Sequence, residues 1–393
     1  MSGSIHGWRR WSACVLLAAS NAWAAPFVPT DDAQILERLP QRAAAQSREL
    51  DRFKAAANAA PRDVNAATAL ANAYYQIARA EGDPRFLGYA QAALKPWWND
   101  ADAPTPVLVA RATILQSDHQ FDRALADLDR ALTREPRNGR ALLVRATVLT
   151  VQGKYAQARA ECPKLFGLVP ELYIVVCVAT VDSLTGKSAA ATATLQRAMN
   201  AAGVTPEARA WAASTLGEIA ARRGDPSAEA QFRAALAFDP RDLYTIGAYS
   251  DWLLDIKRPA DAIPLVRNDV RVDGLLLRLA LAQQAQALPD ANTTTELLRA
   301  RFAASRARGD TVHRREEARF ALWLAKDPAA ALRLATENWN VQREPADLRV
   351  LAEAAAATGD AKAKATVRQW LTETGLEYPV VAAMVAPGTK GSM

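Results

Sequence analysis

Residues 107–136 read VLVARATILQSDHQFDRALADLDRALTREP, and residues 141–170 repeat the pattern as ALLVRATVLTVQGKYAQARAECPKLFGLVP. The tripeptide RAT marks the same place in both stretches, because its two copies lie 34 residues apart. Further matches at this offset are Phe121 with Tyr155, Ala124 with Ala158, Leu128 with Cys162, and Pro136 with Pro170. A fixed period of this length predicts an array of similar units, each stacked on the next.

The composition of the repeat predicts that each unit is a pair of helices. Half of the 393 residues are hydrophobic, 23% are charged and only 18 are glycine, which favours a folded helical chain. Small residues such as Ala112 and Ala124 stand where two helices would cross, since a larger side chain would overpack that contact by about 1–3 kcal/mol. Proline, as at Pro136, ends the second helix because its ring cannot continue the hydrogen-bond ladder.

This spacing resembles the tetratricopeptide repeat, in which two antiparallel helices form one unit. The resemblance is strong across 103–240, fair at 65–98 and 241–270, and weak from 272 to 375. It implies an all-α solenoid of about nine or ten helix pairs, because a single pair cannot cover its own apolar stripes. It also implies a concave groove lined by the first helix of each pair.

We divide the chain into five segments. They are a signal peptide at 1–24, an N-terminal helical cap at 25–64, the solenoid at 65–271, divergent helical repeats at 272–376 and a C-terminal tail at 377–393.

The first 24 residues have the order of a secretory signal peptide. Arg9 and Arg10 precede the short apolar run Ala13–Ala19, and Ala22-Trp23-Ala24 forms a small-x-small cleavage site. The apolar run is too short to span a bilayer permanently, so no integral membrane span is expected in the mature chain. We expect a periplasmic protein; whether the general secretory or the twin-arginine route exports it is left open.

The two clearest repeats predict which residues line the groove. The predicted residues are Val109, Ala110, Thr113 and Gln116 in the first, and Leu143, Val144, Thr147 and Thr150 in the second. This set is small and apolar with hydroxyl groups, so it suits a helix or an extended segment of a partner. The alternative is that these residues pack partly onto the second helices.

Arg111 and Arg145 depart from the repeat pattern, which usually has leucine at this position. One interpretation places each arginine along the helix crossing, with its guanidinium on a neighbouring carboxylate of Asp127, Asp129 or Glu161. The other is a two-arginine ladder that binds a carboxylate of the partner.

Two cysteines, Cys162 and Cys177, remain after removal of the signal peptide. They fall on the second helix of one repeat and the first helix of the next, which are packing neighbours. Export would place them in an oxidising compartment. A disulfide is predicted, with two buried free thiols as the alternative.

Several tryptophans fall on apolar helical stripes and are predicted to be core. These are Trp211, Trp252, Trp323, Trp339 and Trp370. Trp97-Trp98 either plugs the seam between two helix pairs or anchors a partner.

The mature sequence shows no recognisable catalytic chemistry. Its two histidines, His119 and His313, lie in no HExxH or zinc-ligand pattern, and no phosphate-binding loop or GxSxG motif occurs. We therefore predict no catalytic residues, no cofactor and no metal. The arginine-rich run 299–319 is either a surface for an acidic partner or two solvated helix faces, and nucleic acid is not expected.

The function predicted from these features is that of a non-catalytic scaffold or adaptor that binds another envelope protein in its groove. Envelope assembly and export, including polysaccharide export, are settings that differ only in the partner. The alternative is a ligand-binding or enzymatic role in the divergent helical region at 272–376.

Overall fold

The computed structural model describes residues 31, 33, 34, 44–201 and 203–387. The chain divides into two units, residues 1–42 and residues 43–393, and nearly all described residues belong to the second. The predicted signal peptide at 1–24 lies outside the described residues.

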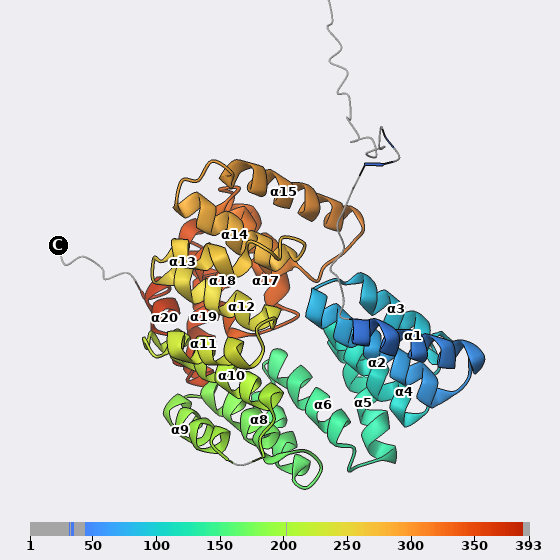
Figure 1. Ribbon diagram of the computed structural model, residues 1–393. Coiled ribbons are helices and arrows are strands. Elements are labelled where there is room, and N and C mark those ends of the chain that lie inside the picture. The colour runs from blue at the N-terminus through green and yellow to red at the C-terminus, as the bar shows by residue number, and fades with distance from the viewer. Residues whose placement is uncertain (1–30, 32, 35–43, 202, 388–393) are drawn as a thin grey trace, which may run out of the picture. The chain divides into compact units, whose positions relative to one another are not determined.

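All regular secondary structure of the described residues is helical, and the helices pack in consecutive pairs (Figure 1), which confirms the predicted all-α fold of stacked pairs. The nine pairs in this part of the chain begin with α2 (Val64–Glu81) and α3 (Arg85–Ala93), α4 (Thr105–Ser117) and α5 (Phe121–Arg134), α6 (Gly139–Val151) and α7 (Tyr155–Glu161), and α8 (Glu171–Ser183) and α9 (Ser188–Met199). They continue with α10 (Pro206–Arg223) and α11 (Ala228–Phe238), α12 (Leu243–Asp255) and α13 (Pro259–Val266), α14 (Asp273–Ala285) and α15 (Ala291–Ala307), α16 (Arg314–Trp323) and α17 (Pro328–Trp339), and α18 (Pro345–Thr358) and α19 (Ala361–Thr374). Helix α1 (Ala44–Ala59) precedes the first pair, α20 (Pro379–Met384) follows the last, and the 3-10 turns η1 (Lys95–Trp97) and η2 (Cys162–Leu165) follow α3 and α7.

Each first helix contacts the second helix of its own pair and the first helix of the next pair. These contacts run without interruption through α14, α16 and α18, so the region of weak resemblance continues the same stack. The stack also extends into the segment predicted as a tail at 377–393. Helix α20 packs on α18 with Val381 fully buried, so that prediction is wrong for this helix.

Small residues set how closely the two helices of a pair approach. Gly217 on α10 faces Phe232 on α11, and a methyl group at Gly217 would lie 2.6 Å from the phenyl ring. Ala112 and Ala124, at the corresponding crossing of α4 and α5, are both 0% exposed. The predicted reason for small residues at these positions therefore holds in the structure.

The stack also coils back on itself, which the repeat period alone does not predict. The Arg343 amide, before α18, donates to the Val151 carbonyl at the end of α6 over 2.7 Å. The turn between α8 and α9 likewise lies against the segment before α20, where a Cβ at Gly186 would be 3.1 Å from the carbonyl oxygen of Gly375. In both cases the contact joins helices twelve apart in the chain.

A hydrophobic cluster seals this contact between distant pairs. Tyr155 at the start of α7 packs against Trp370 on α19, with ring centroids 5.8 Å apart, and Trp370 packs in turn against Trp339. The pairs at the end of the chain thus support pairs that precede them by about 200 residues, as Tyr155 and Trp370 show. Among the described residues, no helix is both long and apolar enough to cross a membrane.

Candidate functional site

The predicted groove residues on α4 are mostly buried. Val109, Ala110 and Thr113 are 4%, 2% and 5% exposed, and Gln116 is half-buried. Helix α4 is packed by α2, α3, α5 and α6, and Val341, from the segment before α18, packs against the same cluster. The prediction that these three residues line an open groove is therefore wrong, because they belong to the core.

On α6 the predicted groove residues are more accessible but offer few free polar groups. Leu143 and Val144 are half-buried and pack against hydrophobic clusters. Thr147 is exposed and Thr150 half-buried, yet their hydroxyls donate to carbonyls of their own helix over 3.0 and 2.8 Å. A role for α6 in binding a partner stays a prediction.

The side chain of Arg111 is buried and forms its hydrogen bonds within the chain. Its guanidinium forms two hydrogen bonds with the Asp127 carboxylate, at 2.6 and 2.7 Å. Its Nη1 donates to the carbonyls of Trp97, Trp98 and Asp100 at 2.7, 2.8 and 3.0 Å. This arrangement contradicts a role for Arg111 in binding a partner's carboxylate, because the side chain is buried and each guanidinium nitrogen already donates to an acceptor of the chain.

Arg145 lies nearer the surface and also pairs with carboxylates of the chain. It pairs with Glu161 at 2.9 Å and with Asp129 at 3.0 Å, and Lys164 adds a second cation to Glu161 at 3.0 Å. Both carboxylates are among those that the sequence suggested as partners. Arg111 and Arg145 therefore form ion pairs within the chain, and each of them joins a first helix to a neighbouring second helix.

Cys162 and Cys177 are joined by a disulfide, and their Cα atoms lie 5.7 Å apart. Cys162 begins the 3-10 turn η2, because Pro163 ends the regular helix α7 early, and Cys177 lies on α8. Both are buried in one small hydrophobic cluster. The bridge covalently connects two consecutive helix pairs.

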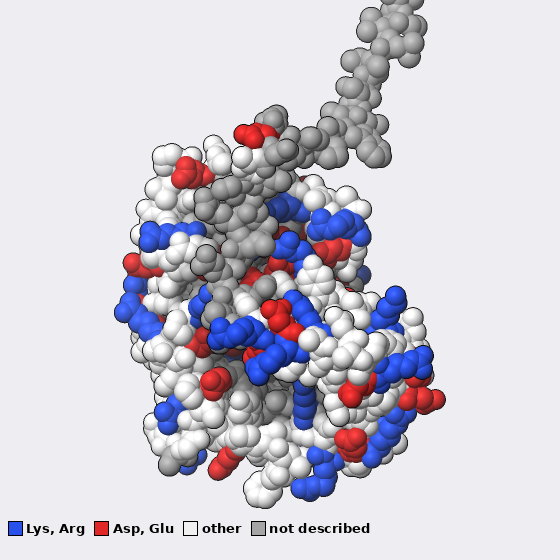
Figure 2. Space-filling model, turned by 45° about the vertical axis from the view of Figure 1, so that its right-hand side comes forward, with Lys and Arg blue, Asp and Glu red and all other residues white. Residues whose placement is uncertain are grey.

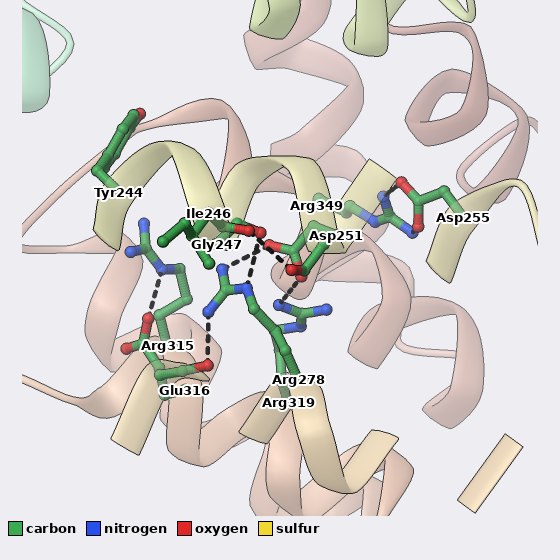
Figure 3. A network of polar contacts seen from close by, with 12 residues as sticks. Tyr244, Ile246, Gly247, Asp251, Asp255, Arg278, Arg315, Glu316, Arg319 and Arg349 are labelled. Carbon is green, nitrogen blue, oxygen red and sulfur yellow. Dashed lines mark hydrogen bonds and ion pairs between the residues drawn. The ribbon is translucent and has the colours of Figure 1, made fainter. Parts of the chain in front are cut away.

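A network of ion pairs runs along the first helices of the C-terminal half (Figure 3). At its centre, Asp251 on α12 accepts hydrogen bonds from Arg278 on α14 at 2.5 Å and from Arg319 on α16 at 2.8 Å. Arg278 also donates to the carbonyls of Gly247 and Gly274 at 2.9 and 2.7 Å. One carboxylate thus links three consecutive first helices.

Two carboxylates of this network stay ionised at low pH. Burial disfavours the charge of Asp251, but Arg278 and Arg319 outweigh burial and lower its pKa to about 2. Burial likewise opposes ionisation of Glu316, and the charge of Arg315 is the largest of those that lower its pKa to about 2. The attraction of each carboxylate to nearby arginines therefore outweighs the cost of removing that carboxylate from water.

A second branch of the network reaches α18. Arg349 binds both carboxylate oxygens of Asp255, one of them at 2.6 Å, and its Nε donates to Glu353 at 2.7 Å. The indole Nε1 of Trp323 donates to the other oxygen of Glu353 at 3.0 Å. Trp323 is 44% exposed, so its prediction as a core residue is wrong.

The third branch is centred on Asp347 at the start of α18. Arg315 lies 3.1 Å from Glu344 and 3.4 Å from Asp347. Asp347 also accepts from the side-chain amides of Asn338 at 2.8 Å and Gln342 at 3.2 Å. Because its members satisfy one another, the network holds the first helices rigidly rather than offering free charges.

The same pairing explains the arginine-rich run 299–319. Six of its arginines, Arg299, Arg301, Arg306, Arg314, Arg315 and Arg319, each pair with a carboxylate of the chain. On the face shown in Figure 2, basic and acidic side chains lie intermixed. The run therefore contributes pairs within the molecule rather than a purely basic surface.

Three aromatic side chains occupy equivalent places on α8, α10 and α12. Tyr173, Trp211 and Tyr244, which we call the aromatic stripe, each precede a buried small residue of the same helix by six residues. Those small residues are Ala179, Gly217 and Ser250. Trp211 is 36% exposed and Tyr244 56% exposed, so Trp211 is not the core residue that the sequence predicted. Tyr173 packs beside Trp211 with ring centroids 5.7 Å apart.

Two charged groups accompany the aromatic stripe. Glu218 on α10 accepts a 2.6 Å hydrogen bond from the Tyr244 hydroxyl, and burial raises the pKa of its carboxyl. Arg140 on α6, at the position equivalent to the stripe, donates to Asn72 at 2.7 Å, and burial lowers the pKa of its guanidinium. The side-chain hydrogen-bond partners of both groups, Tyr244 and Asn72, are neutral.

Sequence reasoning missed the stripe, Glu218 and the ion-pair network. An available signal was the position six residues before a small residue in each helix, which holds Arg140, Tyr173, Trp211 and Tyr244 in four consecutive first helices. In the described residues, no group of three or more histidine, cysteine, aspartate or glutamate side chains could hold a metal ion.

Comparison with family models and with curated proteins finds no match to this sequence. Solved structures with a similar chain path include Cut9 with Hcn1 from the APC/C, at 13% identity and a TM-score of 0.44, over 79% of this chain and 52% of that one. This chain thus spans about half the length of that neighbour. Human IFIT1, in a dimer with m7Gppp-AAAA, is 14% identical with a TM-score of 0.48 and 87% of each chain covered.

A third similar structure is YrrB, a tetratricopeptide repeat protein with an unusual peptide-binding site. It is 22% identical with a TM-score of 0.28, over 51% of this chain and 98% of that one. The architecture of this chain is that of a tetratricopeptide-like solenoid, as its own stacked pairs demonstrate.

Proposed function

We propose that this protein is an exported, non-catalytic scaffold that binds another envelope protein on the face formed by its first helices. The observation that carries the proposal is the aromatic stripe of Tyr173, Trp211 and Tyr244. Two of its rings are more than one-third exposed on helices whose other aromatic residues are largely packed. Exposed tyrosine and tryptophan are the side chains that most often dominate binding energy at protein interfaces.

The ion-pair network supports the proposal through rigidity. It fixes α12, α14, α16 and α18 relative to one another, so a partner would meet a preformed surface and lose less conformational entropy. The network lies beside the stripe, since Tyr244 stands at the start of the same helix that carries Asp251 (Figure 3).

The periplasmic setting is supported by two features of the chain. The first 24 residues have the order of a secretory signal, and Cys162 and Cys177 are joined as an oxidising compartment would allow. The alternative, an enzymatic or ligand-binding domain at 272–376, is less favoured because α14–α19 continue the stack.

Affinity capture from the cell envelope tests the proposal. Wild type, the double variant W211A/Y244A and the control Y89A serve as baits; Tyr89 is 51% exposed on the second helix α3. We expect one set of envelope proteins to be captured by wild type and Y89A and lost from W211A/Y244A, with circular dichroism unchanged. Equal capture by all three baits would contradict a binding role for this face.

A further inference from the structure

Residues 340–344, which link α17 to α18 and which we call the strap, reach from the end of the chain to its early pairs. Val341 packs against the hydrophobic cluster of α2–α6, to which Val109 belongs. The Arg343 amide donates at 2.7 Å to the carbonyl of Val151, the last residue of α6. A carbonyl at this end of a helix has no partner within its own helix, so the strap satisfies a group that the early pairs leave open.

Arg343 makes most of the contacts of the strap. Its guanidinium carbon lies 5.9 Å from the ring centroid of Trp339 and 5.3 Å from that of Trp370, where cation–π attraction is favourable. Its carbonyl accepts a 3.3 Å hydrogen bond from the Tyr155 hydroxyl. Because its amide is also bonded to Val151, this one residue contacts α6, α7 and α19.

Few polar contacts join the early arm, helices α1–α7, to the late arm, helices α12–α20 and the segments between them. Among the described residues there are three: the two backbone hydrogen bonds of Arg343, and Arg271 with Asp83 at 3.6 Å. Within the late arm, by contrast, Asp251 alone joins three helices. Apolar contact, such as that of Tyr155 with Trp370, supplies the rest. Separating the arms would therefore break few of the contacts that hold each arm together.

The closed contact also contains an unsatisfied group. Gln152 follows Val151 at the end of α6, and its side-chain Oε1 is buried without a hydrogen-bond partner. A buried acceptor without a partner costs free energy, and water would satisfy this one if the arms separated. Helices α8–α11 connect the arms, and pairs of a solenoid that contact only their neighbours can shift slightly against one another. Such shifts would add up to a swing of the early arm.

We propose that the strap is a reversible closure, which leaves α6 so that the two arms separate while both keep their helices. In the closed state the strap covers part of the face of α4 and α6, where the sequence placed an open groove. The open state exposes that face, so the strap is an autoinhibitory cover built into the chain. This inference goes beyond the proposed function, because it concerns a movement of the protein alone.

A distance between two spin labels, one on each arm, tests the inference in the full chain. Lys154 and Gln369 are exposed, and each adjoins one side of the closed contact, since a Cβ at Gly153 would lie 2.5 Å from the ring of Trp370. The labels are attached to K154C and Q369C in a C14S background, because the other two cysteines are bridged. Pulsed electron spin resonance then gives the distribution of distances between the labels.

We expect a short distance to dominate with the natural strap and a longer one to form a minority. The variant V341A/R343A should raise the ratio of long to short distances about tenfold, because only the closed state loses the deleted contacts. The matched control is N340A, since Asn340 belongs to the strap but is exposed, and it should leave the ratio unchanged. Circular dichroism should show the same helix content in all three proteins. With the natural strap, low urea should increase the long distance before any helix is lost.

Two outcomes overturn the inference. One is a folded V341A/R343A variant that keeps the distance distribution of the natural strap. The other, which decides the matter even if that variant does not fold, is a long distance that appears in urea only together with the loss of helical circular dichroism. Neither measurement uses a partner, so failure here leaves the proposed function standing. Equal envelope capture by wild type and W211A/Y244A would instead count against the proposed function and leave the strap untouched.

Discussion

At the scale of single residues, the chain places charged groups in the core and satisfies them completely. Arg111 and Asp127 have side chains that are 5% and 4% exposed. Burying two charges is costly, and only the paired geometry and the three backbone carbonyls offset that cost. The contribution of such a pair to the free energy of unfolding is measured most clearly when one partner is replaced and the other is kept.

Replacement of Arg111 by methionine is expected to lower the free energy of unfolding by about 3–5 kcal/mol, because Asp127 stays buried without a cation. The double variant R111M/D127L should recover most of that loss. Urea denaturation followed by circular dichroism measures both. A loss below about 1 kcal/mol for R111M would contradict the assignment of this pair to the core.

The stability of the network should depend on pH through Asp251. Its pKa is about 2 in the folded chain against an ordinary value of 3.8, so the ion pair stabilises the fold above pH 4 and is lost as the pH falls towards 2. This difference between the two pKa values corresponds to about 2–3 kcal/mol. Melting temperatures of wild type and D251N should therefore differ at pH 7 and converge near pH 2. A difference that stays constant from pH 7 to pH 2 would refute this assignment.

At the scale of elements, the helix pairs and their crossings follow from local pattern. The 34-residue period across 107–170, with alanine at crossings and proline after second helices, was sufficient to predict α4, α5, α6 and the start of α7. It did not predict the early end of α7 before Pro163, and it did not predict α20, which is short and carries little periodicity. Burial of Val109 and Thr113 was missed because α4 is covered by Val341, which lies more than 220 residues later.

The candidate site was harder to predict than the helices. Trp211 and Trp323 stand on apolar stripes, so a hydropathy pattern assigns them to the core, although more than one-third of each residue is exposed. The network around Asp251 joins carboxylates and guanidinium groups from four helix pairs. Single-repeat patterns carry no information on such contacts between repeats.

The disulfide is expected to stabilise the connection between α7 and α8. It closes a loop with a sequence separation of 15 residues, and a loop of that size corresponds to about 3 kcal/mol on the chain-entropy model. Reduction should lower the midpoint of urea unfolding accordingly. Thiol titration in denaturant should find no free thiol before reduction; two free thiols before reduction would contradict the bridge.

At the scale of the whole described stack, distant pairs support one another. Trp370 on α19 contacts Tyr155 and would lie 2.5 Å from a Cβ at Gly153, so α19 closes over the turn between α6 and α7. A solenoid held only by neighbouring pairs would lack this coupling. This contact between distant pairs is one reason why residues that a single repeat assigns to the groove are buried in the structure.

Replacement of Trp370 by alanine therefore tests the closure. We expect a loss of about 2–4 kcal/mol, because Trp370 is half-buried and a fully buried tryptophan costs about 3–5 kcal/mol, and faster amide exchange in α6 and α7 as well as in α17–α19. Hydrogen exchange followed by mass spectrometry resolves these helices separately. Faster exchange restricted to α17–α19 would mean that the early pairs do not depend on the late ones.

The central claim is that a partner binds the first-helix face at the aromatic stripe. Photo-cross-linking in living cells tests it most directly, with benzoylphenylalanine in place of Tyr244 and, as a control, in place of Tyr89 on α3. We predict that position 244 cross-links to one defined envelope protein and that position 89 does not. A cross-link from position 89 with none from position 244 would contradict the claim.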